Sequence, residues 1–141
     1  MNKILVAVDG SEYSIKALLK AKEIGSKFNS DITILNVIRP MQDYKYIHNK
    51  DFYKDMERSL LSQSRKLLEK QMLHFEDYPG KVEALYKRGD PADEVVKYAE
   101  EEGFDLVVMG SRGLGVFSRT LLGSVSDKVI HHIKTSVLVV K

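Results

Sequence analysis

Five short apolar runs are spaced along the chain, and longer segments of mixed polarity separate them. The runs are rich in Val and Ile, and most are continuously apolar, which is typical of strands covered on both faces in a parallel sheet. They occupy residues 4–8, 32–37, 82–86, 106–109 and 137–140. The pattern therefore predicts five short strands.

Apolar residues recur at helical spacing in the four segments between these runs. Ser11 can cap the first helix, whose apolar stripe includes Leu18 and Leu19, and Gly25 lies near its expected end. The other three helices are expected from near Asp51 to before Pro79, from Pro91 to Gly103, and from a start near Gly123. Strands and helices then alternate, which predicts an α/β fold: a five-stranded parallel sheet with right-handed crossovers and helices on both faces.

The length and composition restrict the class of protein. A chain of 141 residues with 43% hydrophobic content suits one domain with its own core, residues 1–141. The net charge of +2 is too small to indicate nucleic-acid binding, which needs a clustered basic face. The chain has no cysteine, no signal peptide after Met1 and no run of about 20 apolar residues. We therefore expect a cytoplasmic protein that binds neither nucleic acid nor a membrane.

Candidate chemistry lies where two of the predicted strands end. Asp9 follows the first strand, and Gly110 follows the fourth, ahead of a glycine- and serine-rich stretch that ends at Ser126. In an open parallel sheet, ligands bind at the carboxyl ends of the strands, where the crossovers leave to opposite faces. Glycine allows positive φ and close approach of the backbone, and N–H groups at the start of a helix favour an anion. This combination suits the phosphates of a nucleotide.

Two common nucleotide-binding motifs do not fit this stretch. Gly110 and Gly115 have the glycine spacing of a P-loop, but Val116 and Phe117 stand where that motif needs Lys and Ser or Thr. The segment also follows the fourth strand and lacks the third glycine of the dinucleotide-binding fingerprint. A P-loop is therefore excluded, and a Rossmann dehydrogenase is not favoured.

The stretch does match the pattern Gly-x2-Gly-x9-Gly-Ser, through Gly110, Gly113, Gly123 and Ser124. This pattern resembles the ATP-binding motif of the universal stress protein family. The resemblance covers the whole chain, including the opening Lys-Ile-Leu-Val-Ala-Val-Asp-Gly-Ser and the closing Val-Leu-Val-Val. One departure is Ser136, because family members commonly have proline before the last strand, and we expect it to change local stiffness rather than the site.

The resemblance implies a ligand, a strand order and a set of site residues. The ligand is ATP or another adenine nucleotide, with Mg²⁺ as an optional companion, and the strand order is 3-2-1-4-5 in a Rossmann-like sheet. Asp9 would contact the adenosine and Val37 would offer backbone groups to adenine, while the glycine loop and the start of the last helix would bind ribose and phosphates. The implied binding residues are Ala7, Val8, Asp9, Val37, Met109, Gly110, Arg112, Gly113, Gly123, Ser124, Val125 and Ser126.

Simpler interpretations stay open for several polar residues. Asp9 could only cap the first helix, and Ser124 and Ser126 could only cap the last one, although capping and phosphate contact can coexist. Arg119 could contact phosphate or remain a solvated charge. Residues 39–50 follow no periodicity, and we interpret them as mobile surface in preference to a lid.

The histidines do not indicate a metal site. His131 and His132 are adjacent, so on a helix they diverge by about 100° and cannot chelate one ion as an i, i+4 pair can. His131 follows Asp127 by four residues, which suits a surface pair.

Three functions are compatible with the sequence. A nucleotide-dependent regulatory or sensor protein is the leading hypothesis. A slow ATPase or phosphotransferase would use the same pocket, but no base or catalytic set can be named, so no catalytic residue is predicted. A scaffold that binds no nucleotide is disfavoured because the motif residues are present.

The last predicted strand also indicates self-association. If it lies at the edge of the sheet, its open backbone groups and apolar side chains are not blocked by charge or proline. A homodimer joined through this strand, between Val137 and Val140, is therefore expected.

Overall fold

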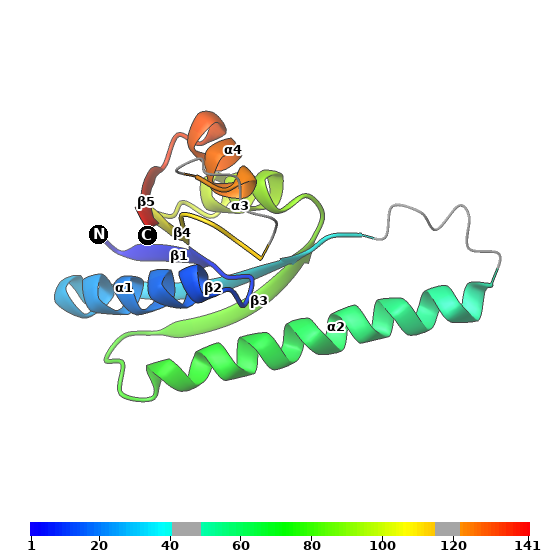
Figure 1. Ribbon diagram of the computed structural model, residues 1–141. Coiled ribbons are helices and arrows are strands. Elements are labelled where there is room, and N and C mark those ends of the chain that lie inside the picture. The colour runs from blue at the N-terminus through cyan, green and yellow to red at the C-terminus, as the bar shows by residue number, and fades with distance from the viewer. Residues whose placement is uncertain (41–48, 115–121) are drawn as a thin grey trace.

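Five parallel strands form one sheet in the computed structural model, which describes residues 1–40, 49–114 and 122–141 (Figure 1). The strands in this part of the chain are β1 (Lys3–Ala7), β2 (Asp31–Ile38), β3 (Val82–Arg88), β4 (Leu106–Gly110) and β5 (Ser136–Val140). Their order is β3-β2-β1-β4-β5, and neighbouring strands are parallel. The predicted fold class and strand order are confirmed.

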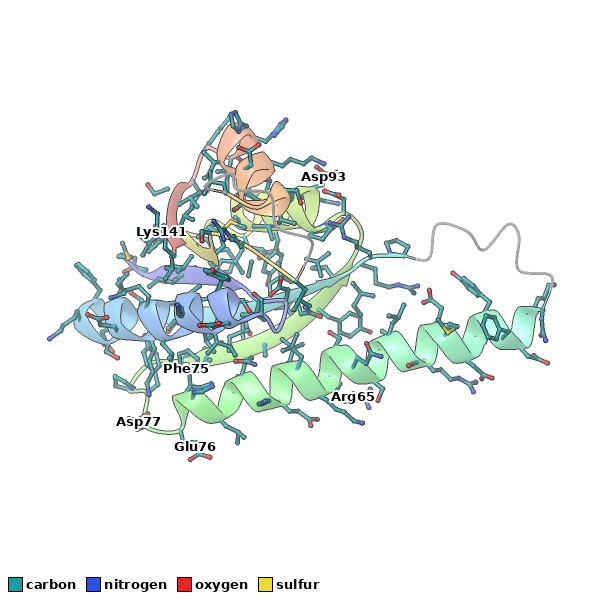
Figure 2. The ribbon with its side chains drawn as sticks, in the orientation of Figure 1. Arg65, Phe75, Glu76, Asp77, Asp93 and Lys141 are labelled. Atoms are coloured by element: carbon teal, nitrogen blue, oxygen red, sulfur yellow. The ribbon has the colours of Figure 1, made fainter. Side chains whose placement is uncertain are left out.

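Among the described residues, two helices cover each face of the sheet. The helices α1 (Glu12–Phe28) and α2 (Lys50–Met72), with the 3-10 turn η2 (Leu73–Phe75), lie on one side, and α3 (Pro91–Glu101) and α4 (Ser124–His132) lie on the other (Figure 1). Figure 2 shows the same division, with Phe75 in the α1–α2 layer and Asp93 in the α3–α4 layer. The crossovers therefore change face between β1 and β4, which is where ligands bind in open α/β sheets.

Alternate residues of the central strands face the two helix layers. Ile4 and Val6 of β1 pack with α1 and α2, whereas Leu5 packs with α3 and α4, and all three are fully buried. Burial on both faces explains why β1 and β4 are almost wholly apolar, whereas β2 also carries the buried polar residues Thr33 and Asn36. The edge strand β3 differs, because Glu83 and Arg88 on it are exposed.

Both ends of α1 follow the sequence signals. Ser11 accepts a hydrogen bond from the Ser14 N–H through its side chain, so the predicted cap is confirmed. Gly25 lies in the last turn of α1, as expected, and its carbonyl accepts a hydrogen bond from the N–H of the C-cap residue Asn29, whose φ of 55° closes the helix. A Cβ at Gly25 would overlap the Tyr78 hydroxyl, so this glycine also allows close packing at the end of the helix.

Some predicted positions differ in exposure or lie outside the described residues. Leu19, assigned to the apolar stripe of α1, is 45% exposed. The first turns of α2 extend past the end of β3 (Figure 1), and Arg65 on this helix points away from the sheet (Figure 2). Most of the 39–50 segment and Arg119 fall outside the described ranges. No helix within those ranges is long and apolar enough to cross a membrane.

Candidate functional site

A cavity of about 920 Å³ lies at the carboxyl ends of β1, β2 and β4, beside the amino-terminal ends of α3 and α4. Its wall contains every residue of the predicted binding set: Ala7, Val8, Asp9, Val37, Met109, Gly110, Arg112, Gly113, Gly123, Ser124, Val125 and Ser126. The pairing of β1 with β4 brings together segments that are about a hundred positions apart in the chain. The fold thus collects the predicted residues around one space.

One part of the cavity wall is apolar. Ala7 and Met109 contribute from the ends of β1 and β4, and Leu35 contributes from β2. Pro91 and Val95 complete this part of the wall from α3. Sequence reasoning missed Leu35, Pro91 and Val95, because their spacing marked them only as strand and helix positions. A flat apolar group such as a purine suits this wall.

Asp9 connects the end of β1 to the loop after β4. Its Oδ1 accepts a hydrogen bond from the Ser11 N–H at 2.8 Å, and its Oδ2 accepts one from the Leu114 N–H at 3.2 Å. The first contact belongs to the turn before α1, and the second holds the glycine loop against the strand end. Since a carboxylate offers about four acceptor positions, Asp9 can also accept a hydrogen bond from a ligand.

The three motif glycines are needed for clearance inside the protein. None of Gly110, Gly113 and Gly123 has positive φ, so the conformational argument made from the sequence is wrong for them. A Cβ at Gly110 would lie 2.7 Å from the Tyr13 Cβ, and one at Gly113 would lie 2.6 Å from the Asp9 Oδ2. A Cβ at Gly123 would lie 3.2 Å from the backbone of the loop after β4. Glycine therefore lets α1 approach the end of β4, and lets Asp9 and α4 approach the loop that follows it.

The start of α4 faces the same cavity. Gly123 is its N-cap residue and makes no side-chain cap hydrogen bond. The buried hydroxyl of Ser126 lies 3.1 Å from the carbonyl oxygens of both Ser111 and Gly123, so it donates within the protein. Ser124 is exposed. An anion at this helix start would therefore meet the backbone N–H groups and the Ser124 hydroxyl.

Charged side chains bridge α3 and α4 next to the cavity residues Pro91 and Asp127. Lys128 Nζ lies 3.0 Å from carboxylate oxygens of both Asp90 and Asp93, and Arg39 lies 3.8 Å from Asp90 (Figure 2 labels Asp93). Asp90 also caps α3 by accepting a hydrogen bond from the Asp93 N–H, and this bond, followed by the one from Lys128, lowers the pKa of Asp90. The two carboxylates raise the pKa of Lys128. This network fixes the amino end of α3 against α4.

Two further charged residues line the cavity and were not predicted to do so. They are Arg39, after β2, and Asp127, in the first turn of α4. The Nδ1 of His131 lies 3.6 Å from the Asp127 carboxylate, so the predicted surface pair is confirmed. Within the described ranges, no group of three or more His, Cys, Asp or Glu side chains could hold a metal ion.

Comparison with known proteins gives a consistent result over the full length. The sequence pattern of the Universal stress protein family matches residues 1–141. The Universal stress protein YxiE of Bacillus subtilis is 32% identical, with 99% of each chain covered. The solved structure of MJ0577 from Methanocaldococcus jannaschii is 33% identical and superposes with a TM-score of 0.86, over 99% of this chain and 95% of that one. A universal stress protein solved in complex with cAMP is 27% identical, with a TM-score of 0.74 and coverage of 99% and 97%.

Proposed function

Because the chain belongs to the universal stress protein family, we propose that it binds an adenine nucleotide, ATP in particular, and acts as a nucleotide-dependent regulatory protein in a cytoplasmic stress response. One observation carries the proposal. A single cavity joins an apolar wall at the strand ends to a glycine loop and a helix start that favours anions. Adenosine and phosphate need these two environments side by side.

The size of the cavity suits a nucleotide, and a relative of the chain has been solved with one bound. Its volume of about 920 Å³ lies within the range of roughly 300–1,000 Å³ that is usual for small-molecule sites. The relative solved with cAMP shares 27% of its residues with this chain over nearly the full length of both. Together these observations support an adenine nucleotide over a ligand without a phosphate.

The proposed binding mode divides the nucleotide between the two parts of the cavity. Adenine lies against Leu35 and Val95, and the backbone of Val37 supplies hydrogen bonds to the edge of the ring. Asp9 accepts a hydrogen bond from a ribose hydroxyl, and the phosphates lie between the loop after β4 and the start of α4. Mg²⁺ is commonly held by phosphate oxygens with one or two carboxylates, and Asp9 and Asp127 are carboxylates on this wall.

Calorimetric titration with ATP, ADP, AMP and GTP, with and without Mg²⁺, tests this function. We expect dissociation constants on the order of micromolar for ATP and at least tenfold weaker binding of GTP. Absence of binding at about 1 mM ATP, together with no nucleotide extracted from the purified protein, would contradict the proposal. Phosphate release measured in the same samples separates a regulatory protein from an enzyme, since typical enzymes turn over at roughly 1 s⁻¹ or faster.

The proposal includes a homodimer formed through β5. This strand is at one edge of the sheet, and its residues from Val137 to Val140 are apolar and only half-buried. The Val140 carbonyl accepts a hydrogen bond from the Ser111 N–H, so Val140 directs its backbone groups toward β4. Because successive residues of a strand direct these groups to opposite sides, Val139 directs its own toward the open edge.

Sedimentation at micromolar concentration tests the dimer. We expect wild type to be dimeric and Val139→Pro, which removes an outward N–H at an edge where proline is tolerated, to be a folded monomer. Val140→Pro is the matched variant that should instead damage the contact with β4 and lower stability. A monomeric wild type would rule out the dimer.

A further inference from the structure

We propose that Asn36 and Ser64 are positioning residues that hold Asp9 in its ligand-binding orientation, an inference that rests on the proposed function. Asn36 is on β2 and Ser64 is on α2, and both are buried, with exposed fractions of 9% and 3%. Asn36 also lines the cavity, whereas Ser64 does not, and neither belongs to the motif of glycines and serines. They act through the peptide unit between Val8 and Asp9.

Side chains hold both sides of that peptide unit. The Val8 carbonyl accepts a hydrogen bond from the Asn36 Nδ2 at 2.8 Å, and the Asp9 N–H donates one to the Ser14 Oγ at 3.3 Å. Ser14 is itself held, because its Oγ donates to the Ser11 carbonyl at 3.0 Å. A peptide plane with both polar ends occupied cannot rotate without breaking a buried hydrogen bond. The direction in which the Asp9 side chain leaves the backbone is thereby fixed.

Ser64 determines which way the Asn36 amide faces. The Ser64 Oγ donates to the Asn36 Oδ1 at 2.7 Å, so the amide nitrogen is turned toward Val8. A buried amide whose donor and acceptor ends are both engaged holds one orientation. Since Ser64 is among the buried residues of α2, this helix contributes to the site without supplying any residue to the cavity wall.

The connection continues from Asp9 to the loop after β4. The Oδ2 of Asp9 accepts a hydrogen bond from the Leu114 N–H. A Cβ added at Gly113 would lie only 2.6 Å from the same oxygen. A small rotation of the Val8–Asp9 peptide would move this carboxylate and release or crowd the loop. The hydrogen bonds thus form one continuous series from α2 through β2 and β1 to the loop.

Another buried polar residue on β2 serves as a matched control. Thr33 is 4% exposed, and its hydroxyl donates to Glu83 on the edge strand β3 at 3.3 Å. It therefore resembles Asn36 in strand and burial but belongs to no hydrogen bond with Val8 or Asp9. Loss of stability alone should appear in Thr33→Val as well, whereas loss of Asp9 positioning should appear only in the Asn36 variants.

The decisive variant is Asn36→Asp, measured for ATP affinity at about pH 8 and about pH 6. An ionised carboxylate cannot donate to the Val8 carbonyl, whereas a protonated one can donate to Val8 and still accept from Ser64. Burial raises the pKa of such a carboxyl, so the change falls in an accessible range. We expect about tenfold weaker binding than wild type at the higher pH and recovery to within about threefold at the lower pH. The two hydrogen-bond partners of Asn36, the Val8 carbonyl and the Ser64 hydroxyl, do not titrate.

Each outcome decides the inference. Wild-type affinity in folded Asn36→Asp at the higher pH, or a loss equal at both pH values, would overturn it. A double-mutant cycle with Asp9→Ala should show that the Asn36→Asp penalty nearly disappears once Asp9 is absent, and additive losses would contradict action through Asp9.

Failure of the proposed function would remain distinguishable. If wild type binds no nucleotide, amide hydrogen exchange at Leu114 still reports on the Asp9 contact. The inference requires faster exchange at Leu114 in Asn36→Asp than in wild type at the higher pH, relative to Thr33→Val. Unchanged exchange there would refute it whatever the ligand.

Discussion

Two aspartates at opposite ends of the central strands use the same chemistry for different purposes. At the amino ends, Asp105 Oδ2 accepts hydrogen bonds from the N–H groups of Asn2 and Lys3, at 2.8 and 2.9 Å. At the carboxyl ends, Asp9 accepts from two backbone N–H groups, one of them on Leu114. Each carboxylate therefore connects the β1 segment to the β4 segment.

The surroundings of the two carboxylates differ. The amino end is closed by contacts among the protein's own groups, such as the Lys3 Nζ, which donates to the Glu102 carbonyl at 2.6 Å and lies over the Phe104 ring. Asp9 instead lines the cavity of about 920 Å³. One end of the sheet therefore uses its polar groups in contacts within the protein, whereas the other places Asp9 on the wall of the cavity.

Substituting one glycine at each end of the sheet should give the largest difference between the ends in ATP affinity and stability. Gly113→Val places a Cβ against Asp9 Oδ2, so we expect ATP affinity to fall by more than about a hundredfold with little loss of stability. Gly103, in the turn before β4, has φ of 68°, and a Cβ there meets nothing within 4 Å. Gly103→Val should therefore leave affinity unchanged and lower the free energy of unfolding by about 2 kcal/mol. Calorimetry measures the affinity and urea denaturation measures the free energy of unfolding, and equal affinity in both variants would contradict the proposed difference between the two ends.

Substituting the two aspartates should give a smaller difference of the same kind, with ATP affinity lost at the carboxyl end and stability lost at the amino end. Asp9→Ala removes an acceptor for the ligand and the contact with Leu114, and we expect a ten- to hundredfold loss of affinity, about 1.4–2.7 kcal/mol. Asp105→Ala should leave affinity within about twofold and lower the free energy of unfolding by about 1 kcal/mol, because solvent screens this exposed group. A large loss of affinity in Asp105→Ala would contradict the division between the ends.

The sequence predicted the carboxyl end better than the amino end for a physical reason. Asp9 and Gly110 each follow an apolar run directly, so their positions at strand ends could be read from local pattern. The partners of Asp105 and Asn36 could not, because these hydrogen bonds join residues 102 and 28 positions apart. The one signal for Asn36 in the sequence was a polar amide inside a mainly apolar run. The role of this amide depends on its hydrogen bond with Ser64 of α2, and the sequence pattern does not show that these two residues meet.

The positions of the strands were similarly easier to predict than the roles of individual glycines. Burial leaves a mainly apolar run, which locates each strand to within two residues here. Gly25 and the motif glycines were interpreted through backbone conformation, whereas the structure shows that neighbouring side chains and backbone occupy the space a Cβ would need. Steric reasons of this kind arise from tertiary packing, and a single sequence does not display them.

The two serines of α4 should separate binding from stability within the carboxyl end itself. Ser124 is exposed beside the helix start, so Ser124→Ala should weaken ATP binding by about fivefold, near 1 kcal/mol, without changing stability. The Ser126 hydroxyl donates to backbone carbonyls, so Ser126→Ala should mainly lower the free energy of unfolding, by about 1 kcal/mol. Calorimetry measures the affinity and urea denaturation measures the stability. Equal changes of both quantities in the two variants would show that neither hydroxyl has a distinct role.

The smallest effect should be the pH dependence of stability at the amino end. The N–H groups of Lys3 and Asn2 lower the pKa of Asp105 below its ordinary value. A carboxyl with a lowered folded-state pKa stabilises the protein fully above its unfolded-state pKa of about 3.9, and this contribution disappears as the pH falls through the folded-state pKa.

Asp105→Asn keeps the shape of the side chain and cannot ionise. Its destabilisation relative to wild type, 1 kcal/mol or less for this exposed group, should therefore be present at about pH 7 and shrink toward zero below about pH 3. Asp90 and Asp77, whose pKa values are also lowered, titrate in both proteins and cancel in the difference. Urea denaturation of both proteins across this range measures the difference, and a destabilisation that stays constant with pH would show that the charge of Asp105 does not hold the strand ends together.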